Sequence, residues 1–495
     1  MSDGKRLGRE SLLTFGGITV NAALAFVVTW LIGSGLGATA TGEFFQLTSW
    51  FMIATSVVGL GADTGLMRAL SRQKSLGEVR LLRSTVRTAV LPVLAVGALL
   101  GATTFAAAPA LGSWMGLDAD GVDTLRILAL ALLPGALIGV LLGGSRGLGR
   151  ISTYTLIQNL LIPVLRLAAV AAAVVWIGSA WAAVWAWAAP LLLAAVLAAF
   201  ALRRQISRDA PAPAALDRVE SVAQRRAFWA FSLPRGGAVI LERALDWADV
   251  LIVIALLGPA AGGVYGVVTR IVQAGSMLEA AMRIVLGPRM SSAVAQGRTG
   301  EARSLFRRVT NLLILSSWPF YIAVAVFAPD LLGLFGEPFR EGATALVVLA
   351  IAMGLRNTGG ALQTVLLMAG RSTSQLMNKA VQLTVLIVLC LVLVPMWGIV
   401  GAAAAYAAGV VVDTLLAGIQ VHRAVGVRAD AREVVRSGAL PVLMVLGGAL
   451  AVSAVFADAS TFARLTGLGA VLAVYGVVLL SVLRRGHGRR GGAHA

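Results

Sequence analysis

The chain is poor in charge, cysteine and histidine. Of its 495 residues 13% are charged and 58% are hydrophobic, a balance that no soluble domain of ordinary composition has. The single cysteine, Cys390, lies inside an apolar run, which excludes a disulfide framework and a cysteine-based metal cluster. The three histidines lie near or beyond residue 422, outside the predicted spans, so the sequence offers no intramembrane histidine metal site or proton relay. No G-x-x-x-x-G-K-[ST] loop is present to hold nucleotide phosphates, and we predict no metal and no cofactor.

Long apolar runs dominate what is there. Runs of about 20 residues, each long enough to cross a hydrocarbon core about 30 Å thick, recur from Leu12 almost to the C-terminus. We count fourteen spans, at about 12–33, 44–67, 88–110, 124–143, 151–177, 180–202, 227–257, 264–288, 310–328, 343–368, 373–394, 398–421, 437–456 and 463–483. An even number places both termini on the same side of the membrane. The sequence therefore predicts an all-α polytopic membrane protein with about 14 transmembrane helices.

The surplus of positive charge follows the predicted topology. The 41 Lys and Arg against 23 Asp and Glu give a net charge of +18, which in a soluble protein would suggest a nucleic-acid partner. Instead, 31 of the basic residues fall in segments on one side of the membrane, and the other side has only Arg126, Arg340 and Arg464. By the positive-inside rule both termini are cytoplasmic. We predict a multi-pass protein of the cell (inner or plasma) membrane and no nucleic-acid partner.

The chain also matches itself at an offset of about 221 residues. Gly42 falls on Gly263, the pair at 149–150 falls on the pair at 370–371, and the stretch from Asp123 falls on the stretch from Thr344. Each copy holds six spans, so the two copies enter the membrane in the same orientation. Such parallel repeats are one of the two arrangements found in secondary transporters, where the substrate site lies between the repeats.

The repeat predicts the domain organisation. The predicted parts are an N-lobe of six helices (10–202), a basic cytoplasmic linker (203–226), a C-lobe of six helices (227–421), two extra C-terminal helices (437–483) and a basic cytoplasmic tail (484–495).

Charged residues inside the spans are the candidates for function, because charge at membrane depth is costly. Span seven carries Arg235, Glu242, Asp246 and Asp249 within about 60° of one helix face, a polar stripe suited to a cavity wall. The alternative is local ion pairing, for which Arg243 is placed next to these acids. The three carboxylates are candidates for an acidic cavity site or for ion coupling.

Three further cations in the second copy, Arg270, Arg356 and Lys379, have no acidic residue three or four positions away. We expect them to bind an anion such as a pyrophosphate. The alternative is pairing across helices with Glu242, Asp246, Asp249 or Asp413. Arg166, three residues after Pro163, is the candidate from the first lobe. The predicted anion site therefore comprises Arg235, Arg270, Arg356, Arg243, Lys379 and Arg166.

Four phrases in this order resemble a known family: LGATATGEFFQL, LGPAAGGVYGVVTRI, GEARSLFRRV and VPMWGIVGAAAAY. With the fourteen spans and the six-plus-six repeat, the chain resembles the polysaccharide-transport branch of the multidrug/oligosaccharidyl-lipid/polysaccharide export (MOP) superfamily over residues 10 to about 425. The resemblance implies a V-shaped pair of six-helix lobes around a central cavity. It also implies a flippase, not an enzyme, that moves an undecaprenyl-pyrophosphate-linked glycan from the cytoplasmic to the external leaflet. The implied partners are this lipid-linked glycan, membrane lipids, and a polysaccharide polymerase or glycosyltransferases.

Three alternatives stay open. A cation-coupled multidrug antiporter of the same superfamily would use the carboxylates of span seven. A lipid II flippase would be expected to carry arginines at the start of span one, where Asn21 is the only strongly polar side chain in mid-span. A membrane glycosyltransferase or polymerase is disfavoured because the predicted external connections are all short.

Overall fold

The computed structural model describes residues 2–209, 218–276, 298–359, 362–368, 372–425 and 431–491. Every regular element in these ranges is a helix, and ten helices are long and apolar enough to cross a membrane. Two of them, α1 (Ser2–Gly59) and α16 (Ser372–Val425), bend at Gly37 and Gly398 and so hold two spans each. Helix α9 (Arg218–Leu257), which is strongly charged, and α10 (Pro259–Ala274) supply the seventh span and the first part of the eighth. The chain is therefore an all-α multi-pass membrane protein, as predicted.

The described chain forms two compact units, residues 1–263 (unit 1) and 264–495 (unit 2). Besides α1 and α9, unit 1 contains α2 (Ala62–Ser75), η1 (Val79–Leu81), α3 (Leu82–Met115), α4 (Ala119–Gly147), α5 (Ile151–Tyr154), the π-helix η2 (Thr155–Leu161), α6 (Ile162–Trp176), α7 (Ala180–Ala188) and α8 (Pro190–Asp209). Besides α16 and most of α10, unit 2 contains α12 (Thr299–Val326), α13 (Ala328–Gly333), η3 (Glu337–Gly342), α14 (Ala343–Thr358), α15 (Leu362–Met368), α17 (Ala431–Pro441), the π-helix η4 (Val442–Leu446), α18 (Gly447–Val455) and α19 (Thr461–Gly491).

Glycines with positive φ recur at the same places in the two copies of the sequence repeat. Helices of both copies meet at glycines with φ in the left-handed region, which residues with a side chain rarely adopt. These glycines recur at an offset of 221 or 220 residues. The three pairs are Gly37 and Gly258 (φ 83° and 88°), Gly116 and Gly336 (69° and 127°), and Gly178 and Gly398 (69° and 59°).

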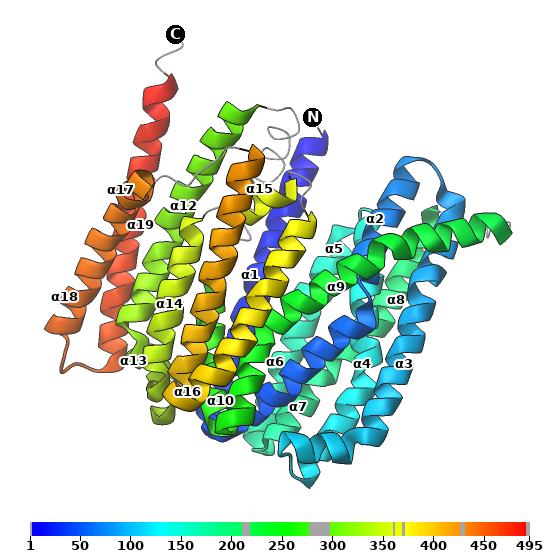
Figure 1. Ribbon diagram of the computed structural model, residues 1–495, viewed down its shortest axis with the longest axis horizontal. Helices are drawn as coiled ribbons and strands as arrows, with labels where there is room; N and C mark the ends of the chain where they lie inside the picture. The colour runs from blue at the N-terminus through cyan, green and yellow to red at the C-terminus, as the bar shows by residue number, and fades with distance from the viewer. Residues whose placement is uncertain are drawn as a thin grey trace. The chain divides into compact units, whose positions relative to one another are not determined.

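Helix α9 packs along α1 and against α2 and α3, so the first span of the second copy belongs by its contacts to unit 1 (Figure 1). Backbones touch at both ends of this packing. A Cβ added at Gly42 would lie 1.7 Å from the carbonyl oxygen of Pro259, and one at Gly61 would lie 2.4 Å from the nitrogen of Gly236. Glycine is required where membrane helices approach this closely. The predicted linker falls partly outside the described residues, at 210–217, as does the end of the predicted tail, at 492–495.

The last two spans are joined to the rest of unit 2 by specific polar contacts, and α17 to α19 lie beside α12 (Figure 1). The Tyr475 hydroxyl donates to the carbonyl oxygen of Leu315, at 2.5 Å. Arg464 forms an ion pair with the buried carboxylate of Asp330, at 3.0 Å. Polar partners of this kind fix the register between membrane helices, so these spans are an integral part of unit 2.

Candidate functional site

The charged stripe of α9 forms two ion pairs along one helix. Nη1 of Arg235 lies 3.4 Å from Oε1 of Glu242, and Nη1 of Arg243 lies 3.5 Å from Oδ2 of Asp246. The four side chains are 39–47% exposed. Charged groups at membrane depth are tolerated where they face water or protein, because hydrocarbon cannot solvate them. This face of α9 can therefore line an aqueous cavity.

Asp249, the last acid of the stripe, differs from the four paired side chains. Asp249 is buried, and its Oδ1 accepts a hydrogen bond from the backbone N–H of Val250, at 2.9 Å. Between residues 235 and 249 of α9, two arginines and three acids carry one negative charge in excess. The local ion pairing that the sequence left open is present, so Arg235 and Arg243 each already have a carboxylate partner.

Arg166 lies in α6 and is held by the neighbouring helix α7. Its Nε donates to the carbonyl oxygen of Trp187, at 2.9 Å, and its guanidinium carbon lies 3.8 Å from the centre of the Trp187 ring. Helix α7 ends at Ala188 and α8 begins at Pro190, and a helix break at a proline frees carbonyl groups to accept other donors. The sequence did not indicate Trp187 as the partner of Arg166.

The Arg166–Trp187 contact is itself supported by aromatic packing. The Trp187 ring meets Phe44 and Phe51 edge to face, with centroid distances of 6.4 and 5.5 Å. Among the described residues, no carboxylate pairs with Arg166. The contacts that hold the guanidinium therefore orient it but leave its charge uncompensated.

Arg270 and Arg356 lie at similar distances from their helix ends in unit 2. They are 11 and 13 residues into helices that begin at Pro259 and Ala343, which at 1.5 Å per residue is about 17 and 20 Å. Nη1 of Arg270 donates to Oε1 of Gln273, at 2.7 Å. Arg270 thus lies four residues before the end of α10, and Arg356 lies in the last turn of α14. The six predicted cations divide evenly, with Arg166, Arg235 and Arg243 in unit 1 and Arg270, Arg356 and Lys379 in unit 2.

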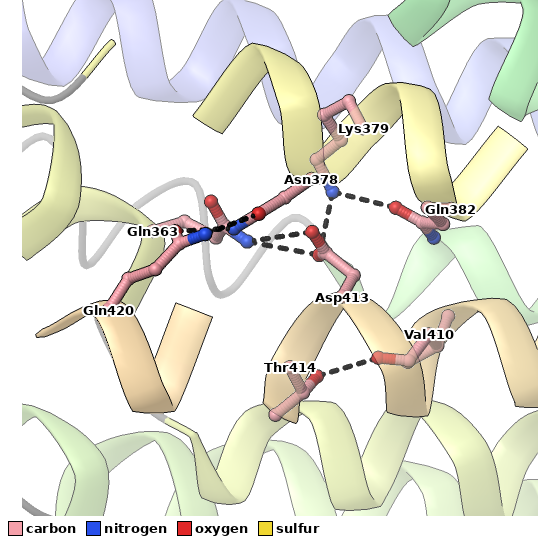
Figure 2. Close-up of polar contacts among 8 residues, drawn as sticks. All are labelled: Gln363, Asn378, Lys379, Gln382, Val410, Asp413, Thr414 and Gln420. Atoms are coloured by element: carbon pink, nitrogen blue, oxygen red, sulfur yellow. Dashed lines mark hydrogen bonds and ion pairs between the residues drawn. The ribbon is translucent and has the colours of Figure 1, made fainter. Parts of the chain in front are cut away.

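Lys379 belongs to a polar network between the two arms of α16 and helix α15 (Figure 2). Its Nζ lies 2.8 Å from Oδ2 of Asp413 and 2.9 Å from Oε1 of Gln382. The Nε2 of Gln363 donates to both oxygens of Asp413, at 3.0 Å. The Asp413 side chain is 4% exposed and that of Lys379 is 23% exposed. The cross-helix pairing that the sequence left open as the alternative is thus what the structure shows for Lys379.

A second pair extends the network, since the side-chain amides of Asn378 and Gln420 exchange hydrogen bonds of 2.9 and 2.8 Å (Figure 2). The sequence identified Asp413 as a possible partner and missed the amides. Their spacing could have found them, because Asn378 and Gln382 lie four residues apart on one arm, and Asp413 and Gln420 lie seven apart on the other.

Comparisons with known proteins agree on a transporter fold. The family described as polysaccharide biosynthesis protein matches residues 7–294, and the family MatE matches residues 234–396. The lipid II flippase MurJ in an inward closed conformation superposes with a TM-score of 0.74 at 10% identity, covering 96% of this chain and 98% of its own. An inward-facing MATE multidrug resistance transporter of the MOP superfamily gives 0.69 at 15%, with 84% and 98% covered. A MOP superfamily transporter from Pyrococcus furiosus gives 0.59 at 16%, with 84% and 95% covered.

At such identities the solved structures establish the fold alone. No curated protein matches the chain significantly. The match to the polysaccharide biosynthesis family covers more than half of the chain and agrees with the resemblance drawn from its sequence phrases. The protein therefore belongs to the polysaccharide biosynthesis protein family, in the polysaccharide-transport branch of the MOP superfamily.

Proposed function

We propose that this protein is a flippase that moves a polyprenyl-pyrophosphate-linked oligosaccharide from the cytoplasmic to the external leaflet of the inner membrane, for cell-surface polysaccharide export. Family membership supports a polysaccharide precursor as the substrate. The observation that carries the proposal is Arg166, a guanidinium at membrane depth that is oriented by Trp187 and has no carboxylate partner among the described residues. Such a cation suits an anionic group that must enter the membrane protein.

The chemistry of a pyrophosphate fits arginine. With Nε bonded to Trp187 and one face stacked on its ring, Arg166 keeps Nη1 and Nη2 for two parallel hydrogen bonds to phosphate oxygens. Arg270 and Arg356 would add charge from the second copy, and the exposed arginines of α9 would shift from their acids toward the ligand. The polyprenyl tail stays in lipid, and alternating access between the two copies exposes the pyrophosphate and glycan outside.

The cycle needs no covalent chemistry in this chain. Both termini lie in the cytoplasm in this proposal, and a polymerase or glycosyltransferases outside the membrane would make transport directional by consuming the glycan. The first test is the leaflet accessibility of lipid-linked oligosaccharide in cells depleted of the protein. We expect accumulation on the cytoplasmic face, and an unchanged leaflet distribution would contradict the proposal.

The site assignment has its own test in Arg270→Ala and Arg356→Ala. Each change removes one cation of the proposed site, so we expect export to be lost while membrane insertion, measured by the amount of protein in the membrane fraction, stays normal. Normal export in both variants would exclude these arginines from the site.

A second candidate, a cation-coupled multidrug antiporter, is favoured by the excess negative charge of residues 235–249 in α9 and by the buried Asp249. It predicts that the protein protects cells from lipophilic cations and that this protection depends on a cation gradient. Depletion would then leave lipid-linked precursors unchanged and make the cells sensitive to such drugs. A lipid II flippase is supported by the fold likeness to MurJ alone.

A further inference from the structure

The Lys379–Asp413 pair has features of an occupied cation site. The ammonium lies between a carboxylate oxygen from one arm of α16 and an amide oxygen from the other, 2.8 and 2.9 Å away (Figure 2). Helix α15 adds Gln363, whose Nε2 holds both carboxylate oxygens and whose Oε1 is buried without a hydrogen-bond partner among the described residues. The two arms of α16 thus bring a carboxylate oxygen and an amide oxygen to the ammonium, and Gln363 of α15 fixes the carboxylate.

Helix packing alone does not require this network, because the first copy does without it. At the repeat offset of 221, Lys379 corresponds to Gln158, and at 221 or 220 Asp413 corresponds to Leu192 or Leu193. Both charges are absent together from the first copy, which forms equivalent helices. A buried ion pair is often no more stabilising than apolar side chains of similar volume. The two charges therefore form one unit that serves a purpose other than packing.

We infer that the Lys379 ammonium is a built-in cation, which fills a monovalent-cation site made by Asp413 and Gln382, with Gln363 holding the carboxylate in place. Oxygen ligands that include one carboxylate suit a hard cation of low charge. With Lys379 in place the carboxylate is already neutralised, so this site takes no free ion. Lys379 is then the residue that makes this part of unit 2 independent of sodium and potassium, a property that goes beyond the proposed flippase function.

The inference makes a specific claim about variants without the lysine. Lys379→Met keeps the length and the apolar stem of the side chain and removes the ammonium. It leaves the buried Asp413 and the amide oxygen of Gln382 with no cation between them, and binding of a free cation to the folded state would then stabilise the protein. Ammonium and methylammonium should act best, because they reproduce the missing group.

The test is the melting temperature of the purified full chain in detergent, in choline chloride and in sodium, potassium, ammonium and methylammonium chloride at equal ionic strength. We expect K379M to have a lowered melting temperature in choline that rises and saturates with the concentration of the small cations. The double variant K379M/D413N is the matched control and should not respond. The wild type should melt at the same temperature in all five salts.

Two results would overturn the inference. One is a folded K379M protein whose melting temperature is the same in every salt. The other is a wild type that gains stability from sodium or potassium and loses this gain in Asp413→Asn, which would mean that a free ion binds while the lysine is present. If K379M cannot be purified, Lys379→Gln is measured in its place, and failure of both variants to recover in ammonium or methylammonium also counts against the inference. Because no transport is measured, these results do not depend on the flippase proposal.

Discussion

Spans five and eleven occupy corresponding places in the two copies, and each carries one lone cation, yet the structure treats the two cations differently. Arg166 of span five is held by the ring and the carbonyl oxygen of Trp187. Lys379 of span eleven is held by the carboxylate of Asp413. An aromatic ring and a carbonyl orient a cation without cancelling its charge, whereas a carboxylate cancels it. Arg166 is therefore the better candidate of the two for the proposed anion site, because Lys379 already has a carboxylate partner.

The backbone of span five differs as well. It contains the π-helix η2, where the buried Asn159 packs against α1 at Gly17, so that a Cβ added at Gly17 would lie 3.2 Å from that of Asn159. π-helical turns in membrane helices frequently occur at functional sites. Gln158, the counterpart of Lys379, lies in this turn and carries no charge. The first copy thus has an uncharged amide and a leucine where the second copy has an ion pair.

The largest effect is expected from separating the two charges of the second copy. Asp413→Leu leaves Lys379 partly buried without its carboxylate, and breaking a buried pair in this way costs about 3–5 kcal/mol. The double variant D413L/K379M removes both charges, as in the first copy, and should recover most of this stability. Chemical denaturation of the two proteins checks the prediction, and a single variant as stable as the double would show that the pair contributes nothing.

An intermediate effect is expected from Arg166→Gln, on transport more than on stability. A hydrogen bond to a charged group contributes about 1.5–3 kcal/mol, so loss of the guanidinium should lower the flipping rate by roughly tenfold to 100-fold. Stability should change by about 1 kcal/mol, the size of a cation–π contact. Flipping in proteoliposomes and thermal unfolding measure the two quantities.

Arg166→Lys is the matched control. It keeps the charge but loses the planar group that stacks on Trp187 and bonds its carbonyl. We expect transport between the values for the wild type and for R166Q. Equal transport by R166Q and the wild type would remove Arg166 from the anion site and with it the contrast between spans five and eleven.

The smallest effect is expected from Arg243→Gln in α9. Its pair with Asp246 is half exposed and 3.5 Å long, and such pairs contribute about 0–1 kcal/mol. Unfolding should therefore change little, and Asp246→Asn should change it as little. Transport should fall less than in R166Q, because Arg243 must leave Asp246 to reach the ligand. An equal loss of transport with normal stability would contradict this ranking.

Much of the fold follows from local sequence. The spans are predictable because each must bury a continuous apolar stretch in lipid, and the repeat is visible because the same turn glycines return after 220 or 221 residues. The charges of α9 were found by helical spacing, which also indicated the pairing of Arg243 with its neighbours. Trp187 was missed because it lies 21 residues from Arg166, on another helix. Spacing within a helix says which face a residue shares and not which helix lies opposite.

The sequence by itself determined the fourteen membrane helices, their division into two copies and the family, since each of these depends on local hydrophobicity, turn residues or conserved order along the chain. Only the tertiary structure decided which of these two cations has a carboxylate partner and which does not. Arg166 and Lys379 look alike in sequence, because neither has an acid within one helical turn. Their difference arises from the neighbouring helix, which offers a tryptophan in one copy and an aspartate in the other, and electrostatic pairing acts through space.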